Sequence, residues 1–187
     1  MNKRIEEQIR KEAECYMAQS RPNWNIPHLY AAVFYMKELI NNEGGNPRIL
    51  LPTIYFHDIG YAGMLKEGYT FKDNDKVKIL HMQKGAKMSK TLLAKIGKFS
   101  NDEIEQIAYL ISIHDNLKEI KTLDAQKVFE ADSLAQIDFK QVPPNFNKEN
   151  FLQWFDFFNE NRIPLFKTQT GKNYLTNLLP LAKNYYN

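Results

Sequence analysis

The chain has 187 residues, of which 43% are hydrophobic and 13% aromatic. This composition predicts one globular domain, or one domain with a helical appendage, and excludes a disordered chain. The net charge is +3, from 25 basic and 22 acidic residues that are scattered along the sequence, which is too mild to predict nucleic-acid binding from electrostatics alone.

The location of the protein follows from three features of the sequence. Its apolar runs are all much shorter than the roughly 18 residues that a membrane helix needs. The first residues become charged at once and lack the apolar core of a secretory signal. The lone Cys15 has no partner for an internal disulfide, as is typical of a reducing compartment. We therefore expect a cytoplasmic protein with no membrane partner.

The first part of the chain predicts three helices. Residues 3 to 19 form an amphipathic pattern, and residues 20 to 27, with two prolines, predict a loop. A second helix is expected from His28 to about residue 40 and ends in the glycine- and proline-containing segment 41 to 47. An apolar third helix then runs into the doublet His57-Asp58.

The middle of the chain predicts a long loop followed by three further helices. Residues 60 to 75 carry three glycines and no clean period, so we expect a long loop beside the doublet, with room for a helical turn. Loops of this length are usually functional or disordered. A helix follows over residues 76 to 96. Ser100 and Glu103 have the spacing of a capping box, which predicts a helix from there to His114. Another is expected over residues 124 to 138.

An aromatic-rich tail and a last helix to Tyr185 follow Pro143-Pro144. The tail's aromatic cluster is expected to pack in the core, with base stacking or dimer contact as the alternative. No segment shows the alternation of a strand, so the sequence predicts an all-α bundle of seven or eight helices. We expect a helical domain over residues 1 to 140 and a helical extension over residues 141 to 187 that packs on it.

The candidate chemistry lies in the histidines. The chain has only four, each on a different predicted helix, and two of them are followed directly by aspartate. Asp132 adds a carboxylate on an apolar face, where an unpaired charge is costly and needs a partner such as a metal ion. Imidazole nitrogen and carboxylate oxygen together suit divalent transition metals. The candidate ligands are His28, His57, Asp58, His81, His114 and Asp132.

This series resembles the metal-binding pattern of the HD-domain superfamily of metal-dependent phosphohydrolases. The likeness includes Ile59-Gly60 after the doublet, Gly85-Ala86 after His81, and the Ala-Asp-Ser-Leu segment around Asp132. The segment from Arg162 to Gly171 is similar to the C-terminal extension of bacterial HD hydrolases.

The resemblance implies a metal site of one or two ions. His28, His57, Asp58 and Asp132 would form the minimal one-metal set of such proteins. His81 and His114 resemble the longer version, in which they bind a second ion and Asp58 bridges the two. Iron, manganese, cobalt, nickel and zinc are the expected metals.

The implied activity is hydrolysis of a phosphate ester or anhydride, with nucleotides among the candidate substrates. Asp58 and Asp115 are the candidate catalytic residues, Asp115 through orienting a ligand or the attacking water. Lys84, Arg162 and Lys172 are candidates for binding phosphate, although solvated surface charge is the alternative for each. Tyr61 is a candidate for the pocket wall.

Several alternatives stay open at this stage. The sequence lacks the lysine that some HD nucleotide hydrolases have shortly after the doublet, and Gly60-Tyr61-Ala62 departs from the Gly-Tyr-Pro motif of the cyclic-dinucleotide phosphodiesterases. The same ligands serve di-iron oxygenases in a minority of HD relatives. A helical regulatory module with a structural metal is the non-enzymatic alternative. The substrate and a homo-oligomeric state are not determined by these patterns.

Overall fold

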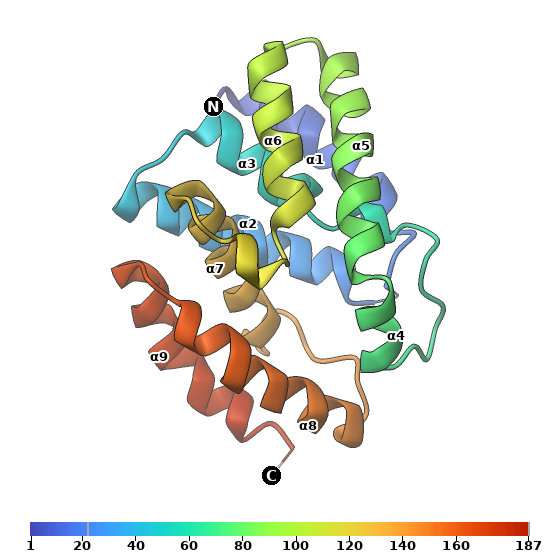
Figure 1. The fold of residues 1–187 in the computed structure, drawn as a ribbon, viewed down its shortest axis with the longest axis vertical. Coiled ribbons are helices and arrows are strands. Elements are labelled where there is room, and N and C mark those ends of the chain that lie inside the picture. Colours follow the sequence, from blue (N-terminus) through green and yellow to red (C-terminus); the bar gives the residue numbers. More distant parts are fainter. Residues whose placement is uncertain (22, 187) are drawn as a thin grey trace.

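The computed structural model describes residues 1–21 and 23–186. Within them all regular structure is helical, which confirms the predicted all-α class (Figure 1). The α-helices of this part of the chain are α1 (Lys3–Met17), α2 (Asn25–Glu43), α3 (Pro47–Phe56), α4 (Phe71–Lys76), α5 (Lys78–Ile96), α6 (Asn101–Ile113), α7 (Leu123–Ile137), α8 (Lys148–Phe157) and α9 (Gln169–Lys183). Short 3-10 or π turns are η1 (Ile59–Tyr61), η2 (Leu117–Glu119), η3 (Phe158–Arg162) and η4 (Ile163–Leu165).

Every α-helix of the described residues except α2 and α5 begins at a residue whose side chain caps it. The capping box predicted at Ser100 is present: Glu103 N donates to Ser100 Oγ at 3.2 Å, and Ser100 N donates to Glu103 Oε2 at 2.8 Å. Asn46 and Thr122 cap α3 and α7 more simply, each through one side-chain oxygen that accepts a hydrogen bond from a backbone amide. Each cap satisfies amide groups that a first helical turn leaves without a partner.

Helix α3 is the centre of the bundle. All its residues from Ile49 to Phe56 are buried, which explains why its sequence is apolar on every side. It packs against α2, α6 and α7, while α2 lies along α7, and α5 pairs with α6 as an antiparallel hairpin (Figure 1). The ends of α3 and α6 and the start of α5 thereby meet beside α2 and α7.

The C-terminal segment is fastened to α7 by one buried carboxylate. Glu130 Oε1 accepts hydrogen bonds from the backbone amides of Lys167 at 2.7 Å and Thr168 at 3.0 Å, and Glu130 Oε2 accepts one from the Thr168 hydroxyl. A Cβ at Gly171 would lie 2.1 Å from Glu130 Oε2, so this approach requires glycine. The tail motif from Arg162 to Gly171 is therefore a structural attachment, and α9 packs on α7 and α2.

Some predicted boundaries were wrong. Helix α2 begins at Asn25 instead of His28, because Pro27 is tolerated in a first helical turn. The helical turn allowed for in the predicted loop 60 to 75 is the short helix α4, which opens with a capping box between Thr70 and Asp73 and runs one residue past the expected end of the loop. The predicted helix 76 to 96 is split at Val77, where α4 ends and α5 begins. Pro22, within the predicted loop 20 to 27, lies outside the described residues.

Most of the aromatic cluster in the tail packs in the core. Phe151, Phe155 and Phe158 are buried, whereas Trp154 is half-buried.

No helix among the described residues is both long and apolar enough to span a bilayer.

Gly60 allows the turn after α3 to touch the backbone of α5. A Cβ there would lie 1.9 Å from the carbonyl oxygen of His81 and 2.7 Å from the amide nitrogen of Gly85. We expect Gly60→Ala to lower the free energy of unfolding by about 3 kcal/mol, since a packed backbone cannot absorb the added methyl group. Gly68→Ala is the control, because Gly68 has a φ of +80° and open space around it, and should cost about 1 kcal/mol. Urea denaturation of both variants checks this; equal stabilities would contradict the close contact.

Candidate metal centre

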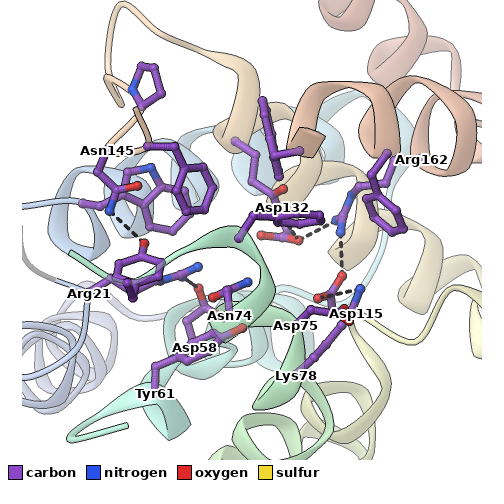
Figure 2. Close-up of a pocket in the computed structure, with 18 of the residues that line it drawn as sticks. Arg21, Asp58, Tyr61, Asn74, Asp75, Lys78, Asp115, Asp132, Asn145 and Arg162 are labelled. Atoms are coloured by element: carbon purple, nitrogen blue, oxygen red, sulfur yellow. Dashed lines mark hydrogen bonds and ion pairs between the residues drawn. The ribbon is translucent and has the colours of Figure 1, made fainter. Parts of the chain in front are cut away.

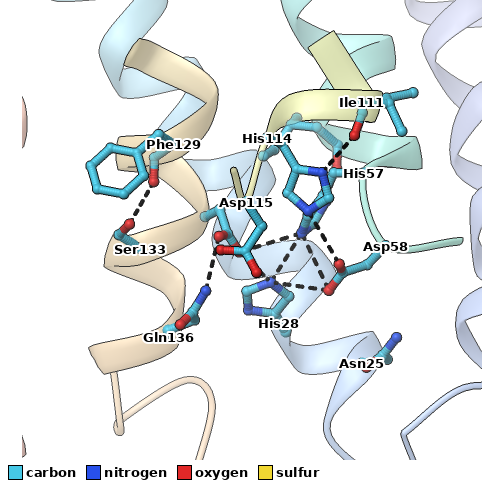
Figure 3. A network of polar contacts seen from close by, with 12 residues as sticks. Asn25, His28, His57, Asp58, Ile111, His114, Asp115, Phe129, Ser133 and Gln136 are labelled. Carbon is cyan, nitrogen blue, oxygen red and sulfur yellow. Dashed lines mark hydrogen bonds and ion pairs between the residues drawn. The ribbon is translucent and has the colours of Figure 1, made fainter. Parts of the chain in front are cut away.

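All six predicted ligands converge on one buried region. Figure 3 shows four of them, His28, His57, Asp58 and His114, facing one another. His28 and His81 are the fourth residues of α2 and α5, while His57 and His114 directly follow α3 and α6. Asp58 comes next to His57, and Asp132 projects from the middle of α7. None of the six is more than 4% exposed. Their burial excludes the alternative of scattered surface histidines.

The histidines form two pairs that share Asp58. In the first pair, Nε2 of His28 and Nε2 of His57 lie 3.1 Å apart, and 3.7 and 3.4 Å from Asp58 Oδ2. In the second, Nε2 of His81 and Nε2 of His114 lie 3.4 Å apart, and 3.5 and 3.6 Å from Asp58 Oδ1. Each carboxylate oxygen of Asp58 therefore faces one histidine pair.

Asp132 belongs to the first pair only. Its Oδ1 lies 3.1 Å from His28 Nε2 and 3.5 Å from His57 Nε2. Two ligand atoms bound to one ion at about 2.0–2.1 Å lie about 3.0–3.4 Å apart. The donor atoms of the two sets lie 3.1–3.7 Å apart, at or just above this range, and they have the mixed nitrogen and oxygen chemistry that divalent transition metals take. The residues therefore fit a metal ion.

In each pair, one histidine follows the end of a helix and the other lies in the first turn of a helix. His57 Nδ1 lies 2.7 Å from the Ile54 carbonyl oxygen, and His114 Nδ1 lies 2.8 Å from that of Ile111. These carbonyls belong to last helical turns and lack helical partners, so each imidazole that follows its helix donates from Nδ1 and leaves Nε2 free as a ligand. The histidines at the helix starts are held by stacking, His28 on Trp24 at 4.2 Å and His81 on Tyr61 at 3.8 Å between ring centroids.

Electrostatics prepares the two aspartates to hold cations. Burial alone would raise the pKa of Asp58, but the charges of His57 and Arg21 outweigh it and hold that pKa well below its usual range. Burial is likewise outweighed at Asp132, whose pKa is held well below its usual range by the charge of Arg162 and by hydrogen bonds from His28 and His57. Both carboxylates are therefore ionised at neutral pH.

His81 and His57 differ in their affinity for a proton. Burial and the charge of His114 lower the pKa of His81 to about 3. At His57 burial acts in the same direction, but the charges of Asp58 and Asp132 prevail and raise its pKa to about 9. Asp58 and Asp132 thus attract a positive charge, which a proton on His57 can supply. A metal ion bound there would displace that proton.

Arg162 lies in the site, with its charge engaged by protein groups. It is 2% exposed and donates from Nη2 to Asp132 Oδ2 at 2.7 Å and from Nη1 to Asp115 Oδ1 at 2.5 Å (Figure 2). Its Nε also donates to Ser133 Oγ at 3.0 Å. Holding Oδ2 in this way leaves Asp132 Oδ1 facing His28 and His57, so Arg162 positions a candidate ligand.

Of the remaining predicted site residues, Asp115 lies in the site, whereas Lys84 and Lys172 lie outside it. Asp115 lies beside His114 and forms a second ion pair, from its Oδ2 to Lys78 Nζ at 3.2 Å. Lys84 Nζ donates to the Ala62 carbonyl at 2.6 Å, and Lys172 is exposed on α9. Neither Lys84 nor Lys172 belongs to the described lining of the pocket beside the metal ligands. Phosphate binding by these residues stays a prediction.

A pocket opens beside the two histidine pairs, with about 790 Å³ of empty space including the solvent at its mouth (Figure 2). The predicted site residues in its wall are Asp58, Tyr61, His114, Asp115, Asp132 and Arg162. The wall is otherwise rich in aromatic rings, which are Trp24, Tyr69, Phe71, Phe139, Phe146, Trp154 and Phe157. The segment predicted as a long loop and the tail both contribute to it. Charged chemistry and a large aromatic surface therefore share one cavity.

Two cations in the pocket wall were missed by the sequence analysis. Arg21 lies in the predicted loop before α2, and Lys78 opens α5. For Lys78 a signal was present, since it precedes His81 by three residues and so shares its helix face. Arg21 carried no periodic signal, because loop residues are placed by tertiary contacts.

The sequence comparisons agree with this geometry. The family model of the HD domain matches residues 26–137, which is more than half of the chain. The chain belongs to the HD domain family. The matched range contains all six candidate ligands of this HD protein and confirms the resemblance inferred from them.

A solved structure is similar to this HD protein over nearly its whole length. The crystal structure of a predicted HD superfamily hydrolase from an uncultured Thermotogales bacterium matches with a TM-score of 0.60 and 16% sequence identity, covering 97% of this chain and 87% of that one. At this identity the likeness concerns the fold alone. No curated protein shows significant sequence similarity to the chain.

The positioning role of Arg162 predicts a stability effect. We expect Arg162→Met to lower the free energy of unfolding by about 3–5 kcal/mol, because Asp115 and Asp132 would remain buried with less compensation. Lys172→Met, the exposed control, should change it by less than about 0.5 kcal/mol. Urea denaturation in the presence of a chelator measures both. If Arg162→Met kept the stability of the unaltered protein and only weakened substrate binding, the phosphate-binding prediction for Arg162 would be favoured.

Proposed function

We propose that this HD protein is a metal-dependent phosphohydrolase that cleaves a phosphate ester or anhydride with water activated at a centre of two metal ions. The observation that carries the proposal is the shared carboxylate: Asp58 Oδ2 faces His28 and His57, while Oδ1 faces His81 and His114. One bridging aspartate between two sets of nitrogen donors suits two neighbouring ions better than one.

The first ion would be held by His28, His57, Asp58 and Asp132, and the second by Asp58, His81 and His114. When bound, divalent ions lower the pKa of water and stabilise negative charge on phosphate oxygens. Three or four protein ligands leave room for water and substrate at transition ions that take five or six, whereas structural sites tend to close with protein ligands. This favours a catalytic centre over a structural metal.

The charges of the pocket support an anionic substrate. Three ionised carboxylates at the inner wall, Asp58, Asp115 and Asp132, are matched by the cations Arg21, Lys78 and Arg162. These charges cancel, so bound divalent ions would give the site a net positive charge. Asp75, also in the wall, offsets only one unit of it. Phosphate oxygens are the ligands that such a site attracts.

Asp115 is the residue proposed to orient the attacking water beside the centre. Burial raises the pKa of its carboxyl, but the charges of Arg162 and Lys78 outweigh that effect and lower the pKa, so the group is ionised at neutral pH. Arg162 holds Oδ1, and the longer contact of Oδ2 with Lys78 leaves that oxygen able to accept a hydrogen bond from the attacking water. Asp115 would thus orient the nucleophile.

The aromatic wall receives the organic part of the substrate. Rings from the 60 to 75 segment and from the tail line the pocket together, among them Tyr69, Phe71 and Trp154. Such surfaces favour a flat or apolar group over a small hydrophilic one. Nucleotides therefore remain among the candidate substrates.

Metal analysis tests the two-ion centre. The purified protein, loaded with manganese or iron, should hold close to two ions per chain, falling toward one in His81→Ala because the second pair loses a ligand. Asn145→Ala, in the pocket wall but outside both pairs, should keep two ions. One ion in the unaltered protein would overturn the dinuclear centre.

A substrate screen tests the reaction. We expect turnover of at least one phosphate ester or anhydride with added manganese, iron, cobalt, nickel or zinc. Asp58→Asn should lower the rate by roughly 1,000-fold, and by more than any single histidine variant, because Asp58 offers one carboxylate oxygen to each pair. No turnover with any ion, in protein shown to bind metal, would refute phosphohydrolysis. Oxygen consumption by the iron-loaded protein would instead favour the di-iron oxygenase.

A further inference from the structure

Arg21 is a buried cation whose place in the site has not been assigned by any of the motifs. It lies between α1 and α2, is 8% exposed and lines the pocket. Its Nη2 donates to Asp58 Oδ2 (Figure 2). Its Nε donates to Asn25 Oδ1 at 2.6 Å. Burying an arginine in this way is costly unless its charge has a dedicated partner.

The guanidinium of Arg21 lies over two aromatic rings, each of which stacks on a histidine of one pair. Its central carbon lies 3.9 Å from the ring centroid of Trp24 and 4.4 Å from that of Tyr61. These two rings stack in turn on His28 and His81. Cation–π contacts on two rings restrict a planar guanidinium far more than an aliphatic wall does. Arg21 is therefore pre-organised beside the site of both ions.

The carboxylate oxygen that pairs with Arg21 is also a candidate metal ligand. Asp58 Oδ2, which accepts its hydrogen bond, is the oxygen that faces His28 and His57. An ion bound there would share that oxygen with the guanidinium, and two cations at one buried oxygen repel each other strongly at low effective dielectric. A bound anion beside Arg21 would relieve this repulsion.

The other pocket cations are differently placed. Arg162 is paired with Asp115 and Asp132, and Lys78 is paired with Asp115, which is not among the candidate ligands. Among the ion pairs of the described residues, Arg21 is the pocket cation whose sole carboxylate partner is the bridging candidate ligand. Metal binding therefore changes the surroundings of Arg21 most directly.

We propose that Arg21 binds the phosphoryl group of the substrate, turning from Asp58 to phosphate oxygens once the first metal ion is bound. The inference rests on the proposed phosphohydrolase function and assigns its anion-recognising residue. The forked guanidinium can offer parallel N–H donors to two phosphate oxygens, which a lysine cannot do with the same geometry. No bond is made or broken by Arg21 itself.

Binding of inorganic phosphate to the manganese-loaded protein tests this role without a known substrate. Calorimetry should show that Arg21→Gln weakens phosphate binding by about 10- to 100-fold, the range expected for lost hydrogen bonds to a charged group. Arg21→Lys should lose less, because it keeps the charge. Arg48→Gln is the matched control, since Arg48 pairs with Glu103 away from the pocket, and should bind phosphate as the unaltered protein does.

A metal titration without phosphate provides the second measurement. Arg21→Gln should bind manganese at least as tightly as the unaltered protein and with the same stoichiometry, because the guanidinium no longer competes for Asp58. Weaker metal binding together with unchanged phosphate affinity of the fully loaded variant would overturn the proposal and leave Arg21 as a residue that only orients Asp58. If Arg21→Gln fails to fold, Arg21→Lys decides by the same criteria: unchanged phosphate affinity overturns the proposal.

Phosphate binding by the unaltered protein distinguishes a failure of the proposed function from a failure of the role proposed for Arg21. If it binds manganese but no phosphate, the phosphohydrolase proposal fails, and the role of Arg21 fails with it. If it binds phosphate and Arg21→Gln binds it equally well, the phosphohydrolase proposal stands and the role of Arg21 alone is refuted.

Discussion

Ionised carboxylates buried in the middle of a helical bundle are the constraint on which the rest of the site depends. Asp58 and Asp132 are each at most 4% exposed, and their charges cannot be left without compensation at that depth. The compensation comes from histidine nitrogens, arginine side chains and the proposed metal ions. The bundle brings them from helices that are distant in sequence, because α3 lies at its centre and the neighbouring helices start or end around its last turn.

The C-terminal segment takes part in the site through the same electrostatic need. Glu130 fastens residues 167 and 168 to α7, and the chain just before this attachment delivers Arg162 to Asp115 and Asp132. A segment that could be read as an appendage thus supplies a buried counter-charge. Its half-buried Trp154 also lines the pocket, so the tail influences both the metal ligands and the substrate cavity.

Residues whose role depends on helix position were predictable, whereas residues whose role depends on a partner were less so. His28, His57, His81 and His114 could be placed at helix ends because periodicity and caps define those ends. Arg162 was expected to meet phosphate, but its buried pairing with Asp132 arises only from the packing of the tail on α7. Helix α4 was expected only as a helical turn within a loop, because six residues give too short a pattern for a period, although Thr70 and Asp73 carried its capping signal.

The sequence by itself determined the all-α class, the family and the six candidate ligands, because these follow from local patterns and from the order of histidine and aspartate along the chain. Only the tertiary structure decided that Asp58 directs one oxygen to each histidine pair, that Asp132 belongs to the first pair, and that Arg21 shares Asp58 with it. The orientation of a carboxylate is set by neighbours from several helices. No local pattern encodes it.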